Sequence, residues 1–232
     1  MKVSNKLHRG TSIAAAVLLL ITLILGTAIN AASLIVLLSV SKPSQTLTSV
    51  LTLGANTFAS LLVIIALFRG KKDTLAGVFF ILTALPSVVT GVFGNISSAF
   101  VYMSRDSLES ASMAAGAIVL IFASLINVVF RVLMATECFK PGRISGRKTR
   151  SLLIILPILY LLLTAVSTVV RQLYLVSYYK AGEFLLLALL PAALSAVLGI
   201  GVVILGLAVS IPVYDKNLSC YPFSTQDTYN FT

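Results

Sequence analysis

The residue types that most often perform catalysis or bind metals are scarce in this chain and form no pattern. The sequence has seven Asp and Glu residues, one His and two Cys among its 232 residues. The acidic residues, which fall in loops, in the C-terminal tail or at the ends of apolar segments, are Asp73, Asp106, Glu109, Glu137, Glu183, Asp215 and Asp227. Acid–base catalysis needs a positioned proton donor or acceptor, and a metal site needs several His, Cys or carboxylate ligands. We therefore expect no enzymatic activity, no catalytic residue, no metal site and no cofactor.

Two polar residues in the middle of the chain are the strongest candidates for a binding function. Arg131 lies inside the apolar segment 111–136, four residues after Asn127, so both side chains share one face of a helix. A charged residue within a membrane is costly and often marks a substrate pathway. Arg131 also has a simpler explanation, because its long side chain could extend toward the lipid headgroups near Lys140. Asn127 also has a simpler explanation, because an amide in a membrane commonly forms a hydrogen bond to a neighbouring helix.

The elements that must position these residues are membrane-spanning helices. Hydrophobic residues make up 58% of the chain and charged residues only 10%, and the mean hydropathy is +1.04, which is outside the range usual for soluble domains. A helix needs about 20 apolar residues to cross the hydrocarbon core. The segments that reach this length are 12–37, 46–68, 74–98, 111–136, 152–174 and 184–213. The sequence therefore predicts an all-α integral membrane protein, a polytopic bundle of about six transmembrane helices.

We expect polar segments to flank one transmembrane domain. The expected divisions are an N-terminal segment over 1–11, the transmembrane domain over 12–214 and a flexible polar tail over 215–232. The basic start and apolar stretch within 1–32 also fit a secretory signal peptide. Apolar residues continue directly through 33–40, which favours an uncleaved first helix.

The basic residues predict the orientation of the chain in the membrane. Most of the 17 Lys and Arg residues fall in the N-terminal segment, in the loop 69–72, in the loop 137–150 and in the C-terminal tail. After an even number of crossings these regions all lie on one side. The positive-inside rule then places that side, with both termini, in the cytoplasm.

The loop 137–150 carries the densest group of basic residues. Such residues next to a membrane attract anionic lipids, by about 1 kcal/mol each, although they also act simply as a topology signal. The expected contacts to lipid headgroups are Lys140, Arg143, Arg147, Lys148 and Arg150. Membrane lipids are the expected partners. Nucleic acid is not, because the basic residues form short clusters between apolar segments.

Two similar stretches interrupt the third and the sixth apolar segments. LPSVVTGVFG at 85–94 and LPAALSAVLG at 190–199 share Leu, Pro, Val and Gly at matching positions. Proline removes a backbone donor and bends a helix, and glycine lets helices approach closely. The residues expected to form kinks or to line a substrate pathway are Pro86, Gly94, Pro191 and Gly199. A weak 3+3 inverted repeat of the kind found in secondary transporters would explain the similarity, and so would biased membrane composition.

Two hypotheses of function follow from these features. The first is a small transporter or lipid-handling protein for an apolar or amphiphilic substrate, because of the proline interruptions and Arg131. The alternative is a non-catalytic membrane scaffold or assembly factor, because the spans contain no acidic residue for ion coupling. Small residues four apart, such as Ser112 and Gly116, predict close helix packing and allow a homo-oligomeric face or a membrane protein partner.

Overall fold

The protein is all-α over the part of the chain that its structure, a computed structural model, describes. The described residues are 4–40, 43–105, 107–140, 147–179 and 182–213, with side chains described outside 29–30, 32–49, 108–109, 147–149 and 172–195. Every regular secondary-structure element within these ranges is a helix, and no β-strand occurs in them. The predicted all-α bundle is therefore confirmed.

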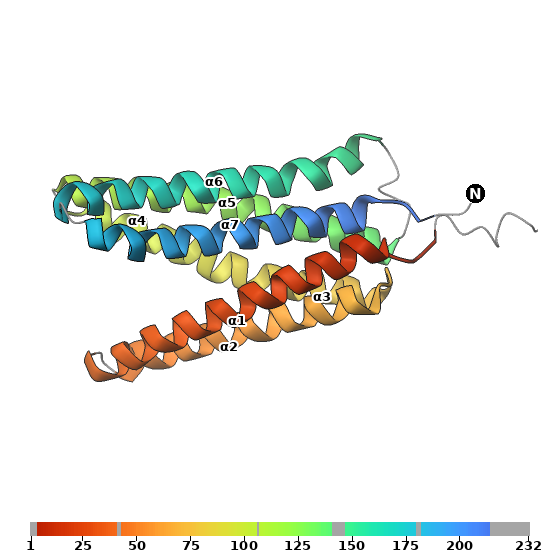
Figure 1. The fold of residues 1–232 in the computed structure, drawn as a ribbon, viewed down its shortest axis with the longest axis horizontal. Helices are drawn as coiled ribbons and strands as arrows, with labels where there is room; N and C mark the ends of the chain where they lie inside the picture. Colours follow the sequence, from red (N-terminus) through yellow and green to blue (C-terminus); the bar gives the residue numbers. More distant parts are fainter. Residues whose placement is uncertain (1–3, 41–42, 106, 141–146, 180–181, 214–232) are drawn as a thin grey trace, which may run out of the picture.

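Six long helical stretches run back and forth along the bundle (Figure 1). In chain order they are α1 (Arg9–Val40), α2 (Pro43–Arg69), a composite stretch, α5 (Leu108–Phe139), α6 (Arg147–Tyr179) and α7 (Gly182–Ser210). The composite stretch consists of α3 (Thr74–Pro86), the π-helix η1 (Ser87–Phe93) and α4 (Gly94–Met103). These helices agree with the predicted segments to within a few residues at each end.

Length and apolarity make this chain a multi-pass membrane protein. Five helical stretches are long and apolar enough to cross a membrane, and α7 adds the shorter apolar helix Ala196–Ser210 among the fully described residues. Large apolar side chains such as Phe58, Phe100 and Leu162 are exposed on the outside of the bundle. A soluble protein would bury most of them, whereas lipid is a favourable environment for them.

The turn between α2 and α3 is tight, and its local sequence explains it. Gly70 has a φ of 62°, a left-handed conformation that is accessible to glycine without steric cost. Asp73 caps α3 by accepting a hydrogen bond from the backbone N of Ala76 at 2.8 Å, and Arg69 forms an ion pair with Asp73. The turn thereby places Lys72 beside the ends of α5 and α7.

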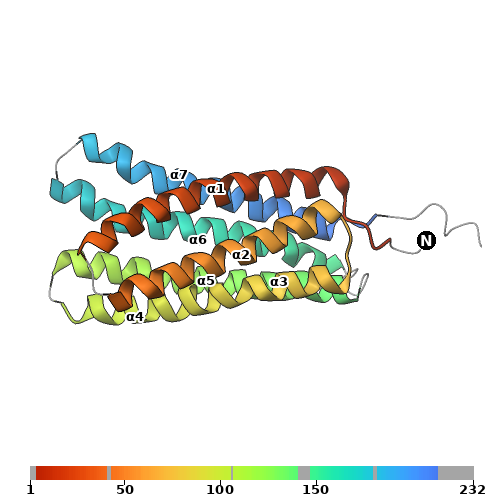
Figure 2. The same cartoon turned by 90° about the horizontal axis from the view of Figure 1, so that it is seen from below.

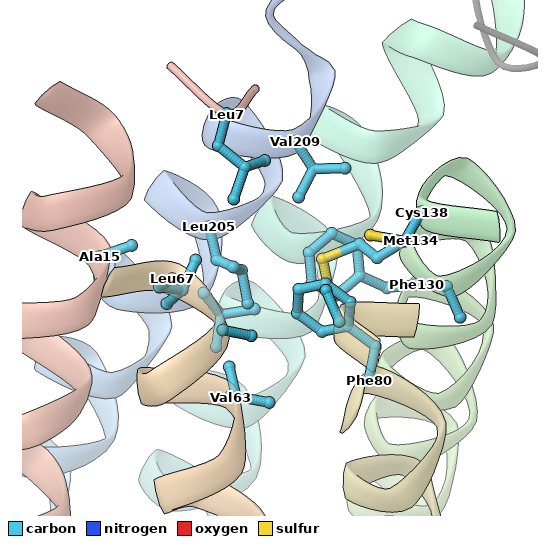
Figure 3. Close-up of a cluster of buried hydrophobic side chains, with 14 of the residues drawn as sticks. Leu7, Ala15, Val63, Leu67, Phe80, Phe130, Met134, Cys138, Leu205 and Val209 are labelled. Atoms are coloured by element: carbon cyan, nitrogen blue, oxygen red, sulfur yellow. The ribbon is translucent and has the colours of Figure 1, made fainter. Parts of the chain in front are cut away.

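The helices pack together through a hydrophobic cluster near the ends of the described chain. Figure 3 shows Leu67 of α2, Phe80 of α3, Met134 of α5 and Leu205 of α7 converging there, and all four are buried. Away from this end, Figure 1 shows the α1–α2 hairpin diverging from α5, α6 and α7. The bundle is therefore closed at one end and splayed at the other.

Both ends of the described chain meet at the closed end of the bundle (Figure 2). The backbone N of Ser4 donates to the carbonyl of Val213 at 2.7 Å, and that of Leu7 donates to the carbonyl of Gly70 at 2.9 Å. The two ends therefore lie on the same side of the membrane domain. The assignment of this side to the cytoplasm stays a prediction.

The two proline-containing stretches differ in structure. After Pro86 the α-helical bonding changes to the wider bonding of η1, while α7 stays α-helical through Pro191. Proline has no N–H to donate to the preceding turn, and a π-helical segment is one way to accommodate the loss. The inverted repeat stays a hypothesis, and the tail 215–232 lies outside the described residues.

Candidate functional site

A cavity of about 280 Å³ lies between α1, α2, α3, α5 and α7. Its apolar lining is mostly leucine and valine. Its polar lining is Thr22, Thr27, Asn56, Thr57, Ser60, Thr83 and Arg131. Ligand pockets usually measure about 300–1,000 Å³, so this cavity suits a small molecule or the end of a larger one. It lies beside the splayed hairpin, within the membrane-spanning part of the chain.

Three polar residues of α2 face this cavity and have no partner among the residues that the structure describes. Asn56, Thr57 and Ser60 are each partly exposed, and none forms a hydrogen bond with another group of the described chain. Thr22 of α1 differs, because its hydroxyl donates to the carbonyl of Leu18 at 2.9 Å. That local bond is the usual solution for a hydroxyl in a membrane helix. The α2 groups are thus available to bond a ligand.

Arg131 supplies the positive charge of the cavity. Its Nε donates to Asn127 Oδ1 at 3.2 Å, and Asn127 Nδ2 donates to Ser87 Oγ at 3.4 Å. Since Asn127 lies one turn farther from Lys140, the guanidinium extends back along α5. This direction is opposite to the one that headgroup contact near Lys140 would require.

The polar network continues into the π-helix. Ser87 is the first residue of η1 and follows Pro86 directly. Its hydroxyl donates to the carbonyl of Thr83 at 3.4 Å, and Thr83 also lines the cavity. The structure therefore brings Arg131 and Asn127, which the sequence analysis paired on one helix face, to Ser87, the residue after the predicted kink at Pro86.

A second arginine–asparagine pair contacts η1 farther along. Arg171 Nη2 donates to Asn95 Oδ1 at 3.4 Å, and Asn95 Nδ2 donates to the carbonyl of Gly91 at 2.6 Å. The Arg171 side chain lies over Gly116, where an added Cβ would come within 2.6 Å of Arg171 Cγ. Gly116 therefore permits the approach of α6 to α5 at this point.

The two glycines predicted as site residues, Gly94 and Gly199, are not part of the described cavity lining. Gly94 is exposed, and an added Cβ there would meet only the carbonyl of Val89, at 3.8 Å. Gly199 is buried, and an added Cβ would overlap Leu161 of α6, so it serves close packing of α7 on α6. The Pro191 side chain lies outside the described ones.

The basic loop is described only in part. Lys140 and Arg150 are exposed, Arg143 lies outside the described residues, and Arg147 and Lys148 begin α6 with side chains that are not described. Contact of these residues with lipid headgroups stays a prediction.

A buried ion pair closes the bundle near the termini, and the sequence analysis did not identify it. Lys72 Nζ lies 3.3 Å from Glu137 Oε1, and the two side chains are 2% and 7% exposed. Lys72 also donates to the carbonyl of Val209 at 2.8 Å. One side chain thus links the start of α3 to the ends of α5 and α7. The two charges are 65 residues apart in sequence, so no local pattern signals their contact.

Known proteins give no further guidance. Comparison of the chain with protein-family models, with curated proteins and with solved structures finds no match. The part of the chain that the structure describes also contains no group of three or more His, Cys, Asp or Glu residues that could hold a metal ion. The cavity with Arg131 is therefore the strongest candidate for a functional site.

Proposed function

We propose that this multi-pass membrane protein binds an amphiphilic molecule in the cavity and acts as a small transporter or lipid-handling protein. The observation that carries the proposal is the composition of the cavity wall, where leucines and valines lie beside three unpartnered polar residues of α2 and Arg131. Apolar walls with a few convergent polar groups are typical of ligand sites. An arginine within a membrane-spanning helix is itself typical of a substrate pathway.

The shape of the bundle supports a route to this cavity. The α1–α2 hairpin diverges from α5, α6 and α7 at the end away from the termini (Figure 1). At the opposite end the hydrophobic cluster and the buried Lys72–Glu137 pair hold α2, α3, α5 and α7 together. We infer that an amphiphile enters between the hairpin and the other helices. Transport would require the closed end to open in turn.

Two glycines offer a matched test of the cavity. An added Cβ at Gly26, which lines the cavity, or at Gly54, which does not, would meet no atom within 4 Å. Both glycines lie in helices, so replacement by leucine improves helix propensity at each, by about 1 kcal/mol. Gly26→Leu should fill the cavity, whereas Gly54→Leu should leave it open.

The assay is transbilayer movement of a fluorescent phospholipid in phosphatidylcholine vesicles that contain the purified protein. We expect the wild-type protein and Gly54→Leu to accelerate the movement and Gly26→Leu to be inactive. Native mass spectrometry of the same preparations should show a bound amphiphile that Gly26→Leu loses. An inactive wild-type protein that carries no amphiphile but co-purifies with a stoichiometric protein subunit would instead support the scaffold alternative.

A further inference from the structure

We infer that the amphiphile bound in this cavity carries a single anionic group, a carboxylate or a phosphate, that pairs with Arg131. The inference rests on the proposed function, since it names the class of molecule that the same cavity binds. It depends on three features of the site among the described residues: an unneutralised charge, free donor groups in the same lining, and the absence of an acidic residue from that lining.

The charge of Arg131 has no protein anion to neutralise it among the described side chains. These include two carboxylates, of which Asp73 pairs with Arg69 and Glu137 pairs with Lys72. Arg131 bonds instead to the neutral amide of Asn127. A charge away from water is strongly destabilising unless it is paired. A bound anion would supply that pair.

The donor groups suit a carboxylate or a phosphate. A guanidinium has five N–H groups, and only the Nε of Arg131 has a hydrogen-bond partner within the described chain. The terminal nitrogens are not among the buried atoms without a partner, so they are accessible, and Arg131 is part of the cavity lining. Two of their N–H groups can bond two oxygens of one anion, which is the strongest geometry for arginine. The bond to Asn127 holds the guanidinium in place for this contact.

The remaining lining selects against other headgroups. Arg131 is the one charged residue in the described lining, which contains no Asp or Glu. A cationic or zwitterionic headgroup would therefore place an ammonium group without a carboxylate partner in a low-dielectric site. The neutral groups of α2, such as Ser60 and Asn56, can bond a further anion oxygen. The apolar chain would lie against leucines such as Leu23 and Leu198.

The test measures which headgroup the full-length protein prefers. The protein in phosphatidylcholine nanodiscs would be titrated with palmitate, palmitate methyl ester, phosphatidylglycerol and inorganic phosphate, with binding followed by native mass spectrometry. We expect palmitate and phosphatidylglycerol to bind at least about tenfold more tightly than the ester, as the strength of a charge-assisted bond implies. Inorganic phosphate that binds as tightly as the amphiphiles would identify a free anion as the source and overturn the amphiphile assignment.

Arginine variants show whether Arg131 causes this preference. Arg131→Gln should abolish the preference for palmitate while the ester still binds, and Arg131→Lys should keep part of it because the charge remains. Arg105→Gln is the matched control, because Arg105 is exposed and lies outside the cavity lining. It should retain the full preference. Melting curves of all three variants would show that they are folded.

Two results separate the inference from the proposed function. Equal binding of palmitate and its ester, or a preference that survives Arg131→Gln, would overturn the anion inference, while the effect of Gly26→Leu would still stand. No binding of any amphiphile, together with no effect of Gly26→Leu in vesicles, would refute the proposed function itself.

Discussion

The buried Lys72–Glu137 pair should be one of the largest single contributors to the stability of the closed end. At an N–O distance of 3.3 Å, an effective dielectric constant of about 20 gives an attraction of about 5 kcal/mol. This attraction offsets the cost of removing both charges from water. Loss of one partner removes this attraction while the other charge stays buried, which typically costs about 3–5 kcal/mol.

A double-mutant cycle measures this contribution. We expect Lys72→Met and Glu137→Leu each to lower the free energy of unfolding by about 3–5 kcal/mol, because each leaves a buried charge. The double variant should lose less free energy of unfolding than either single variant, since it removes both charges together. The measurement is equilibrium unfolding of the purified protein in mild detergent, supported by melting temperatures.

The exposed Arg69–Asp73 pair, whose side chains are 37% and 35% exposed, serves as the control. Solvent screens such a pair, so its cycle should give a coupling of no more than about 1 kcal/mol. The pair would not stabilise the closed end as argued if the effects of the Lys72 and Glu137 variants on the free energy of unfolding were additive. The same conclusion would follow if both cycles gave the same small coupling energy.

The remaining predictions concern packing, the π-helix and topology. Gly206→Ala should destabilise the protein by about 1–3 kcal/mol, because the added Cβ would overlap a backbone carbonyl of α6. Gly54→Ala should instead stabilise it by up to about 1 kcal/mol. Melting curves of both variants test this contrast. Pro86→Ala restores a backbone donor, so it should regularise η1 toward α-helix and reduce phospholipid movement in vesicles, with unchanged movement contradicting a role for the π-helix. The two Asn-X-Ser/Thr sequons of the C-terminal tail should stay unmodified in a eukaryotic host if the tail is cytoplasmic, and a glycosidase-sensitive gel shift would reverse the predicted orientation.

The arrangement of spans is predictable because the bilayer imposes it. A minimum apolar length fixes where a helix can cross, which is why the predicted segment 74–98 matches a composite helix that runs from Thr74 to Met103. The pairing of Arg131 with Asn127 is predictable for a similar reason, since residues four apart on a helix are neighbours. Both predictions depend on local geometry alone.

The cavity and the ion pair depend instead on how distant helices meet. Thr57 and Ser60 are ordinary polar residues of a membrane helix in sequence, and only the divergence of the α1–α2 hairpin turns them into cavity lining. Glu137 likewise lies at the end of an apolar segment, where an acidic residue usually meets water. The tight turn at Gly70 brings Lys72 to it and buries both.

The contrast between the two proline stretches has a residue-level explanation. In the first stretch Ser87, Thr90 and Asn95 each donate a side-chain hydrogen bond to a backbone carbonyl of the same helical stretch, at 3.4, 2.7 and 2.6 Å. These bonds satisfy backbone carbonyls near Pro86 and η1, where the backbone N–H donors of a regular α-helix are missing or shifted. In the second stretch Ala192 and Ile200 stand at the positions of Ser87 and Asn95 and cannot donate such a bond, whereas Ser195 stands at the position of Thr90.

Pro86 together with Ser87 and Asn95 therefore accounts for the π-helix better than a proline alone does. Pro191, which lacks counterparts of Ser87 and Asn95, leaves α7 α-helical, although Leu, Pro, Val and Gly at the matching positions are the same. The same polar side chains connect η1 to its surroundings, since Ser87 accepts from Asn127 and Asn95 accepts from Arg171. The two similar stretches thus differ in their contacts among the described residues: Ser87 of the first stretch bonds to Asn127, the partner of Arg131, whereas Leu198 of the second stretch lines the cavity directly.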